Sequence, residues 1–186
     1  RKYHHEYWFL WKETALILNY SNNTWYTYTN MPFVSMLEVD QRTFGFTQEG
    51  KIKEVSRSYR NDDGEEISAY AATGAMDFDR DWQLKYSPVI FVAIKPENNA
   101  RITVTAESNR RSDYPDKVVA ASFASFTNVD FNHWSFLTNR KPQVERLKLK
   151  VKKATFYRLI FKSDSASATA TVLETDVQLR YAGNVK

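Results

Sequence analysis

The sequence contains no cysteine among its 186 residues. Disulfide bonds, thiolate zinc sites and cysteine nucleophiles are therefore excluded. The absence favours a reducing compartment, although secreted domains of this size can manage without disulfides. Histidine is also scarce, with only His4, His5 and His133. Adjacent histidines on a strand point to opposite faces, which is poor geometry for one metal ion, so we predict no metal site and no cofactor.

Glycine and proline occur only five times each, which leaves little scope for long flexible linkers. The glycines are isolated, so no phosphate-binding loop is formed. No nucleophile elbow accompanies His133, which argues against a Ser-His-Asp triad. The run from Asp77 to Asp81 begins like a calcium loop, but Trp82 and Pro88 stand where Gly and Glu are required. We therefore predict solvated turns there, no catalytic residues and no enzyme activity.

Long apolar runs and helical periodicity are absent too. No run approaches the roughly 20 residues of a membrane helix, so we expect no membrane contact. The start, Arg1 to Glu6, is polar and unlike a signal peptide. It holds no initiating Met, and we expect the chain to be a C-terminal piece of a longer polypeptide. The net charge of +4 permits an anionic partner without requiring one.

Strand-forming residues dominate what is present, and aromatic residues make up 15% of the chain. Short apolar runs separated by turns predict an all-β fold. Residues 1–56 hold six such runs: Glu6–Trp11, Thr14–Tyr20, Thr24–Thr29, Phe33–Val39, Arg42–Thr47 and Lys51–Val55. Their order is typical of a partial β-propeller, a blade-like sheet that needs neighbouring blades. The alternative is that they belong to the same sandwich as the rest.

Residues 57–66 are polar and charged, with Asp63-Gly64 as a turn, and we interpret them as a linker. Residues 67–186 then predict an antiparallel β-sandwich. Val89–Ile94 is apolar at nearly every position and predicts a central strand. The turn Lys95–Asn99 predicts a hairpin with Arg101–Thr105. Further strands are expected at Ile67–Thr73, Val144–Lys152, Thr155–Phe161 and Ala170–Tyr181, and residues 116–142 are interpreted as an excursion over a sheet edge.

The cleanest alternation of the chain lies in Val144–Lys152. Leu147, Leu149 and Val151 face one way, and the opposite face carries four cations, Arg146, Lys148, Lys150 and Lys152. Cations at every second strand position recur about every 7 Å, so this face is a candidate for non-specific contact with DNA phosphates. The commoner role of such lysines is to protect an exposed strand from edge-to-edge pairing.

Aromatic residues of the first half form a second candidate site, comprising Trp8, Trp11, Trp25, Tyr26 and Tyr28. Such residues are more often core or subunit interface than anything else. The alternative is a platform for sugar rings.

A family resemblance adds to these predictions from composition and pattern. It rests on Asn23-x-Trp25-Tyr26-x-Tyr28, Phe44-Gly45, Gly50-Lys51-Ile52, Glu66–Tyr70, Met76–Phe78, Lys85-Tyr86, Val92–Pro96 and the ending Val177–Lys186. These motifs resemble the C-terminal part of tailed-bacteriophage structural proteins, such as the nozzle or tail-hub components of short-tailed phages. In those proteins a β-propeller closes and a β-sandwich follows. The segment 116–142 has no counterpart.

The resemblance implies a structural protein of the virion, assembled in the host cytoplasm. Copies would form a homo-oligomeric ring around the genome channel and would contact other virion proteins. The aromatic residues would then be interface, and the basic strand would approach the DNA. The competing hypothesis is a carbohydrate- or receptor-binding β-sandwich module, in which the aromatic side chains would form an exposed row.

Overall fold

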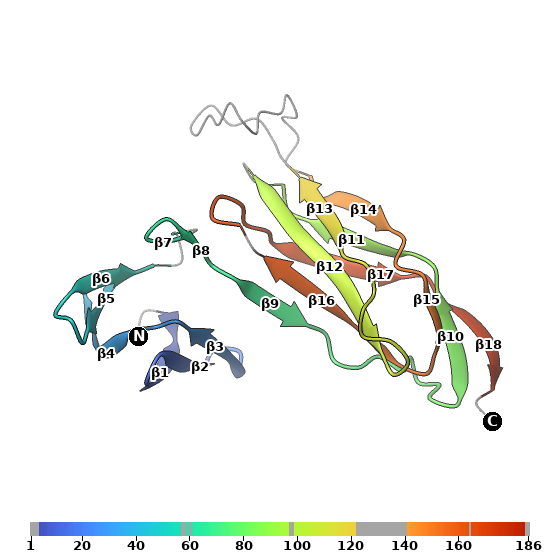
Figure 1. The fold of residues 1–186 in the computed structure, drawn as a ribbon, viewed down its shortest axis with the longest axis horizontal. Coiled ribbons are helices and arrows are strands. Elements are labelled where there is room, and N and C mark those ends of the chain that lie inside the picture. The colour runs from blue at the N-terminus through green and yellow to red at the C-terminus, as the bar shows by residue number, and fades with distance from the viewer. Residues whose placement is uncertain are drawn as a thin grey trace. The chain divides into compact units, whose positions relative to one another are not determined.

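A computed structural model describes residues 4–56, 59, 61–96, 99–121, 141–163 and 165–184. Strands form nearly all of the regular structure in these ranges, so the predicted all-β fold with antiparallel sheets is confirmed. The chain divides into two compact units, Arg1–Tyr59 and Arg60–Lys186 (Figure 1). The boundary lies inside the segment interpreted as a linker. In the described residues no helix has the length and apolarity to span a membrane.

The smaller unit consists of two three-stranded antiparallel sheets. One has the order β1 (Glu6–Trp11), β2 (Thr14–Asn19) and β3 (Thr24–Thr29), and the other has the order β4 (Phe33–Val39), β5 (Arg42–Thr47) and β6 (Ile52–Val55). All six predicted runs are strands. Their tight turns use left-handed residues such as Asn23, Asp40 and Gln41. No closed propeller is present in the described residues, so the propeller blade stays a prediction.

The larger unit begins with a short hairpin of β7 (Asn61–Asp62) and β8 (Glu65–Glu66). Its turn is the predicted Asp63-Gly64 pair, and both residues have positive φ. A four-stranded sheet follows, with the order β13 (Lys117–Ala121), β12 (Ala100–Ser108), β16 (Tyr157–Ser163) and β9 (Ala69–Ala72). Most of the predicted edge-covering segment lies outside the described residues, including His133; its described part contains β13.

Two three-stranded sheets complete the larger unit. Their orders are β14 (Gln143–Leu147), β11 (Ile90–Ile94), β17 (Val172–Val177) and β15 (Val151–Ala154), β10 (Gln83–Ser87), β18 (Arg180–Asn184). Each strand of the first sheet is continuous in sequence with one of the second. The chain breaks at Pro88, which has no N–H to donate to a ladder, and Lys150 N still donates to Pro88 O over 3.4 Å. The two sheets are thus successive halves of one bent layer.

This bend corrects two predicted strands. Val144–Lys152 was expected to be continuous, but it forms β14 and β15, with Lys150 in the left-handed region at φ 57° between them. Ala170–Tyr181 is likewise divided into β17 and β18. Alternating apolar residues predict which side chains are buried, but they do not show where a ladder is interrupted.

The core of the larger unit lies between the four-stranded sheet and the bent layer. It includes Ile90, Val92 and Ile94 of β11 together with Val104 of β12 and Leu159 of β16. In Figure 1, β12 and β16 overlie β11 and β17. The central position of β11, between β14 and β17, is confirmed.

The predicted hairpin between the central strand and Arg101–Thr105 is wrong. β11 pairs with β14 and β17, whereas β12 pairs with β13 and β16. The turn after Ile94 therefore carries the chain from one sheet to the other. Because β11 and β12 both contribute buried apolar side chains to one core, they face each other across it and do not lie side by side.

Candidate functional site

The four predicted cations are all exposed, and the residues between them are buried. Leu147, Leu149 and Val151 enter the core, with Val151 completely buried. Arg146, Lys148, Lys150 and Lys152 face solvent on the other side. The alternation survives the strand break because the left-handed Lys150 changes the direction of the chain without turning its side chain inward.

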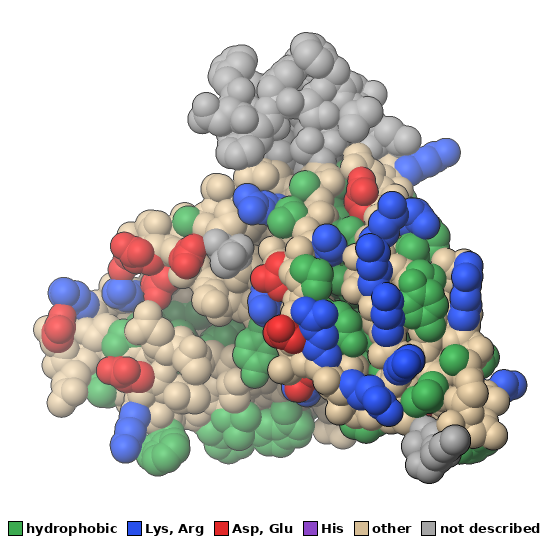
Figure 2. All heavy atoms as spheres, turned by 45° about the vertical axis from the view of Figure 1, so that its right-hand side comes forward, with side chains coloured by type: hydrophobic (Ala, Val, Ile, Leu, Met, Phe, Trp, Pro, Cys, Tyr) green, Lys and Arg blue, Asp and Glu red, His purple; other side chains and the backbone are tan. Residues whose placement is uncertain are grey.

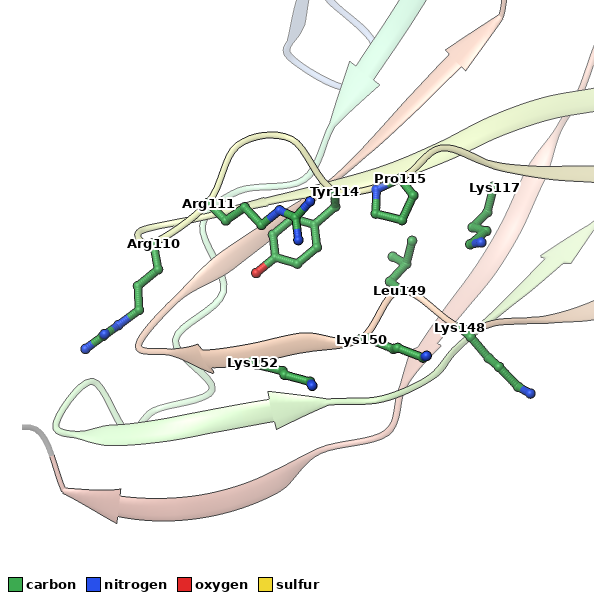
Figure 3. Close-up of a pocket in the computed structure, with 9 residues that line it drawn as sticks. All are labelled: Arg110, Arg111, Tyr114, Pro115, Lys117, Lys148, Leu149, Lys150 and Lys152. Atoms are coloured by element: carbon green, nitrogen blue, oxygen red, sulfur yellow. The ribbon is translucent and has the colours of Figure 1, made fainter.

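Three of these lysines line a groove together with residues from a distant loop. Lys148, Lys150 and Lys152 share it with Arg110, Arg111 and Lys117, around a volume of about 390 Å³. The remaining lining residues are Tyr114, Pro115 and Leu149. Figure 3 shows Arg111 and Lys117 on one side, the three lysines on the other, and Leu149 between them. Arg146, on β14, is not among the lining residues. We call this feature the basic groove.

The loop that supplies the arginines is held against β12 by short-range bonds. Ser108 N donates to Arg111 O over 2.7 Å, and Arg111 N donates to Ser108 Oγ over 3.1 Å. Thr105 Oγ1 donates to Tyr114 O over 2.8 Å. The Tyr114 ring is buried, and its hydroxyl has a hydrogen-bond partner in Ser108 Oγ, 3.2 Å away. These bonds fix the backbone that carries Arg110 and Arg111 beside the lysines.

The charge of the basic groove is almost entirely positive. Six of its nine lining residues are Lys or Arg, and none is acidic. Asp113 lies beside it and pairs with Arg111 at 2.8 Å, and this hydrogen bond lowers the pKa of the Asp113 carboxyl. The other five lining cations have no ion pair with a described residue. Lys and Arg side chains also gather on the surface of the larger unit in Figure 2.

The five predicted aromatic residues are divided between two faces of the β1–β2–β3 sheet. Trp8 and Tyr26 lie on the face that includes the buried Ile17, with Tyr28 two positions further along β3. There the buried Glu6 carboxylate accepts from Trp8 Nε1 at 2.9 Å and from the Tyr26 hydroxyl. Trp8 and Tyr26 are half-buried here, whereas Tyr28 is exposed, so this face is only partly covered.

Trp11 and Trp25 lie on the opposite face, which is open. We call it the aromatic face, and define it by the exposed residues Tyr7 (60%), Phe9 (54%), Trp11 (74%), Leu16 (41%) and Trp25 (54%). Its other strand positions hold Leu18 and three threonines, so all nine are uncharged, and Lys12, just after β1, places its Nζ 5.2 Å from the centroid of the Trp11 ring. Tyr7 and Phe9 are not among the predicted interface residues, although strand alternation with Trp11 indicates that all three share a face.

The remaining polar clusters are structural. Asp77 Oδ1 accepts from Asp79 N at 3.0 Å, which makes the acidic run a turn, as predicted. Within the described ranges no group of three or more His, Asp or Glu side chains could hold a metal ion.

No model of a protein family matches the chain, and no curated protein matches it.

Proposed function

We propose that this chain is a structural component of a bacteriophage virion, in the tail nozzle, the tail hub or the head-tail connector region. In this proposal copies form a homo-oligomer around the genome channel and also contact other virion proteins. The resemblance of its motifs to the C-terminal part of such proteins supports the proposal. So does the larger unit, which we interpret as an antiparallel β-sandwich because two layers of strands enclose one core. We propose no catalytic role.

The aromatic face is the single observation that carries this proposal. Aromatic side chains offer about 150–250 Å² each, so five apolar residues about half exposed present roughly 500 Å². Contiguous apolar patches of that size mark interaction sites. Because its strand positions are uncharged and Lys12 reaches it only at Trp11, copies can meet on most of this face without placing like charges together. We assign it to contacts between copies.

A second candidate function is carbohydrate or receptor binding through the same face. The observation that favours it is the Phe9–Trp25 ring pair, which is near parallel at 24° with centroids 6.2 Å apart. Aromatic rings presented in this way can bind the apolar faces of sugar rings.

The mass of the purified protein in solution, measured by light scattering over a range of concentrations, tests the two candidates. We expect an oligomer, and we expect the double variant Trp11→Gln/Trp25→Gln to be monomeric because it loses the two largest side chains of the aromatic face. Trp82→Gln is the matched control, since Trp82 is 57% exposed and lies in the larger unit. A stable monomer that binds a glycan through Trp11 or Trp25 would overturn the assembly proposal.

A further inference from the structure

We propose that the basic groove binds the phosphate backbone of DNA and does not read its bases. This deepens the proposed function, because it identifies the surface that would face the genome. It does not depend on assembly, since every residue of the basic groove belongs to the larger unit of one chain.

Charge is the first argument. Lys and Arg recognise phosphate as point charges and as planar donors, respectively. The basic groove places four lysines and two arginines around one depression, and of these six cations only Arg111 has an ion pair with a described residue, the carboxylate of Asp113. Uncompensated cations that converge on one depression create a positive potential there, which attracts a polyanion.

Placement is the second argument. The cations come from opposite sides, with Arg111 and Lys117 facing Lys150 and Lys152 (Figure 3). Two rows of cations can contact a phosphate chain that runs between them. The backbone bend at Lys150 and the hydrogen-bonded loop at Ser108 position these rows independently of any ligand.

The lining also shows what the basic groove does not recognise. Stacking on bases requires an open aromatic ring, but Tyr114 is only 7% exposed and its hydroxyl pairs with Ser108. Leu149 is 2% exposed. No Asn, Gln, Asp or Glu lines the depression, so beyond the cations it lacks the side chains that read base edges. We therefore expect little preference between DNA sequences.

An acidic protein segment is the competing polyanion, and the composition of the basic groove disfavours it. Protein interfaces are depleted in Lys and rich in apolar anchors at their centre. Here four of nine lining residues are Lys, and the apolar Leu149 and Tyr114 are already buried in the larger unit.

Fluorescence anisotropy with a labelled mixed-sequence duplex of about 20 base pairs, over about 50–200 mM salt, tests the proposal. Each phosphate contact contributes about 0.9 to the slope of log K against log salt, so five to six contacts predict a slope of about −5. Measurements use the monomeric variant Trp11→Gln/Trp25→Gln as well as the parent protein, so that several grooves in one oligomer do not inflate the slope. A second duplex sequence should bind within about threefold of the first.

The triple variant Lys148→Gln/Lys150→Gln/Lys152→Gln should reduce the magnitude of the slope by about 2.7 and weaken binding at low salt at least about tenfold. The matched control is Lys95→Gln/Arg101→Gln/Arg180→Gln, which removes the same charge from exposed positions outside the basic groove. Its slope should stay unchanged. An equal loss in both triple variants would show that only net charge matters, and would overturn the site.

The variant Lys150→Gly separates binding from folding. Glycine favours the left-handed conformation that Lys150 adopts, so the melting temperature should not fall while the slope loses about 0.9. No binding to duplex at about 50 mM salt, or tighter binding of polyglutamate than of DNA, would overturn the proposal. A monomer that binds DNA in the basic groove would contradict only the assembly proposal, and an oligomer without DNA binding would contradict only this one.

Discussion

At the scale of single residues, Tyr157 is the clearest case of a polar group buried without a hydrogen bond. Its side chain is completely buried in the core of the larger unit and packs against Phe78, with ring centroids 5.6 Å apart. Its hydroxyl has no hydrogen bond with a described residue, and neither has the buried Ser87 hydroxyl. Burial raises the pKa of Tyr157 to about 12, and the nearby Ser87 hydroxyl opposes part of that shift.

This pKa predicts how stability changes in alkaline solution. Below pH 10, the ordinary pKa, both the folded and the unfolded states keep the proton. Between pH 10 and about 12 only the unfolded state loses it, so the free energy of unfolding falls as pH rises. Tyr157→Phe should make that fall smaller and should change stability at neutral pH by less than about 1 kcal/mol, because only a weak contact with the Ser87 hydroxyl is lost.

Urea unfolding followed by circular dichroism, from pH 7 to 12, measures the difference between the two proteins. Other titrating groups are common to both proteins and cancel in the difference. A Tyr157→Phe variant that loses stability as steeply as the parent between pH 10 and about 12 would contradict the assignment.

At the scale of elements, Lys85 joins three segments of the larger unit. It lies in β10, is completely buried, and its Nζ donates to the backbone carbonyls of Arg80, Gln83 at 3.1 Å and Thr155 at 2.6 Å. Burial lowers the pKa of Lys85, while Asp77 and Asp81 act in the opposite direction. The ammonium thus fixes the acidic turn and the loop after β15 to the bent layer.

Replacing Lys85 by Met keeps most of the side-chain volume but leaves the carbonyls without their donor. A buried acceptor that loses its partner costs about 1–3 kcal/mol, so we expect a total loss of about 3 kcal/mol in the free energy of unfolding. Lys152→Met is the control, because Lys152 is exposed and its loss should change stability by less than about 0.5 kcal/mol. Denaturant titration of both variants measures this, and equal stabilities would refute the role given to Lys85.

At the scale of the whole molecule, the two surfaces that we propose for binding should respond oppositely to salt. The strand positions of the aromatic face are uncharged, so association through it depends mainly on burial of apolar surface, which salt does not weaken. The basic groove would bind through charges, and at about 1 M salt the Debye length, over which charges interact, is only about 3 Å.

We therefore expect the oligomer to keep its mass in about 1 M NaCl while bound duplex is released. Light scattering with and without labelled duplex, at low and high salt, follows both properties in one sample. Dissociation of the oligomer by salt would show that charged residues, not the aromatic face, hold the copies together.

Sequence patterns predicted most strands because each depends on residues close together in the chain. Glu6–Trp11 and Thr24–Thr29 have the predicted bounds, and Asp63-Gly64 forms the predicted turn, with positive φ at both residues. Alternation also predicted that Lys148, Lys150 and Lys152 are exposed, because burial of Leu149 and Val151 places the intervening side chains outside. Strand bounds, turns and side-chain alternation depend only on neighbouring residues and on which face of the strand is buried.

Strand pairing and the composition of the sites were decided only by the tertiary structure. The hairpin failed because β11 and β12 pack across a core, and nothing in the turn between them distinguishes that from pairing. Arg110, Arg111 and Lys117 are separated from Lys148 by at least 30 positions, so no spacing in the sequence unites them. Likewise, the buried Glu6 carboxylate accepts from Trp8 and from Tyr26, two residues that are 18 positions apart in the sequence. By itself the sequence determined the strands and their faces, whereas contacts between distant segments depend on how several strands share one core.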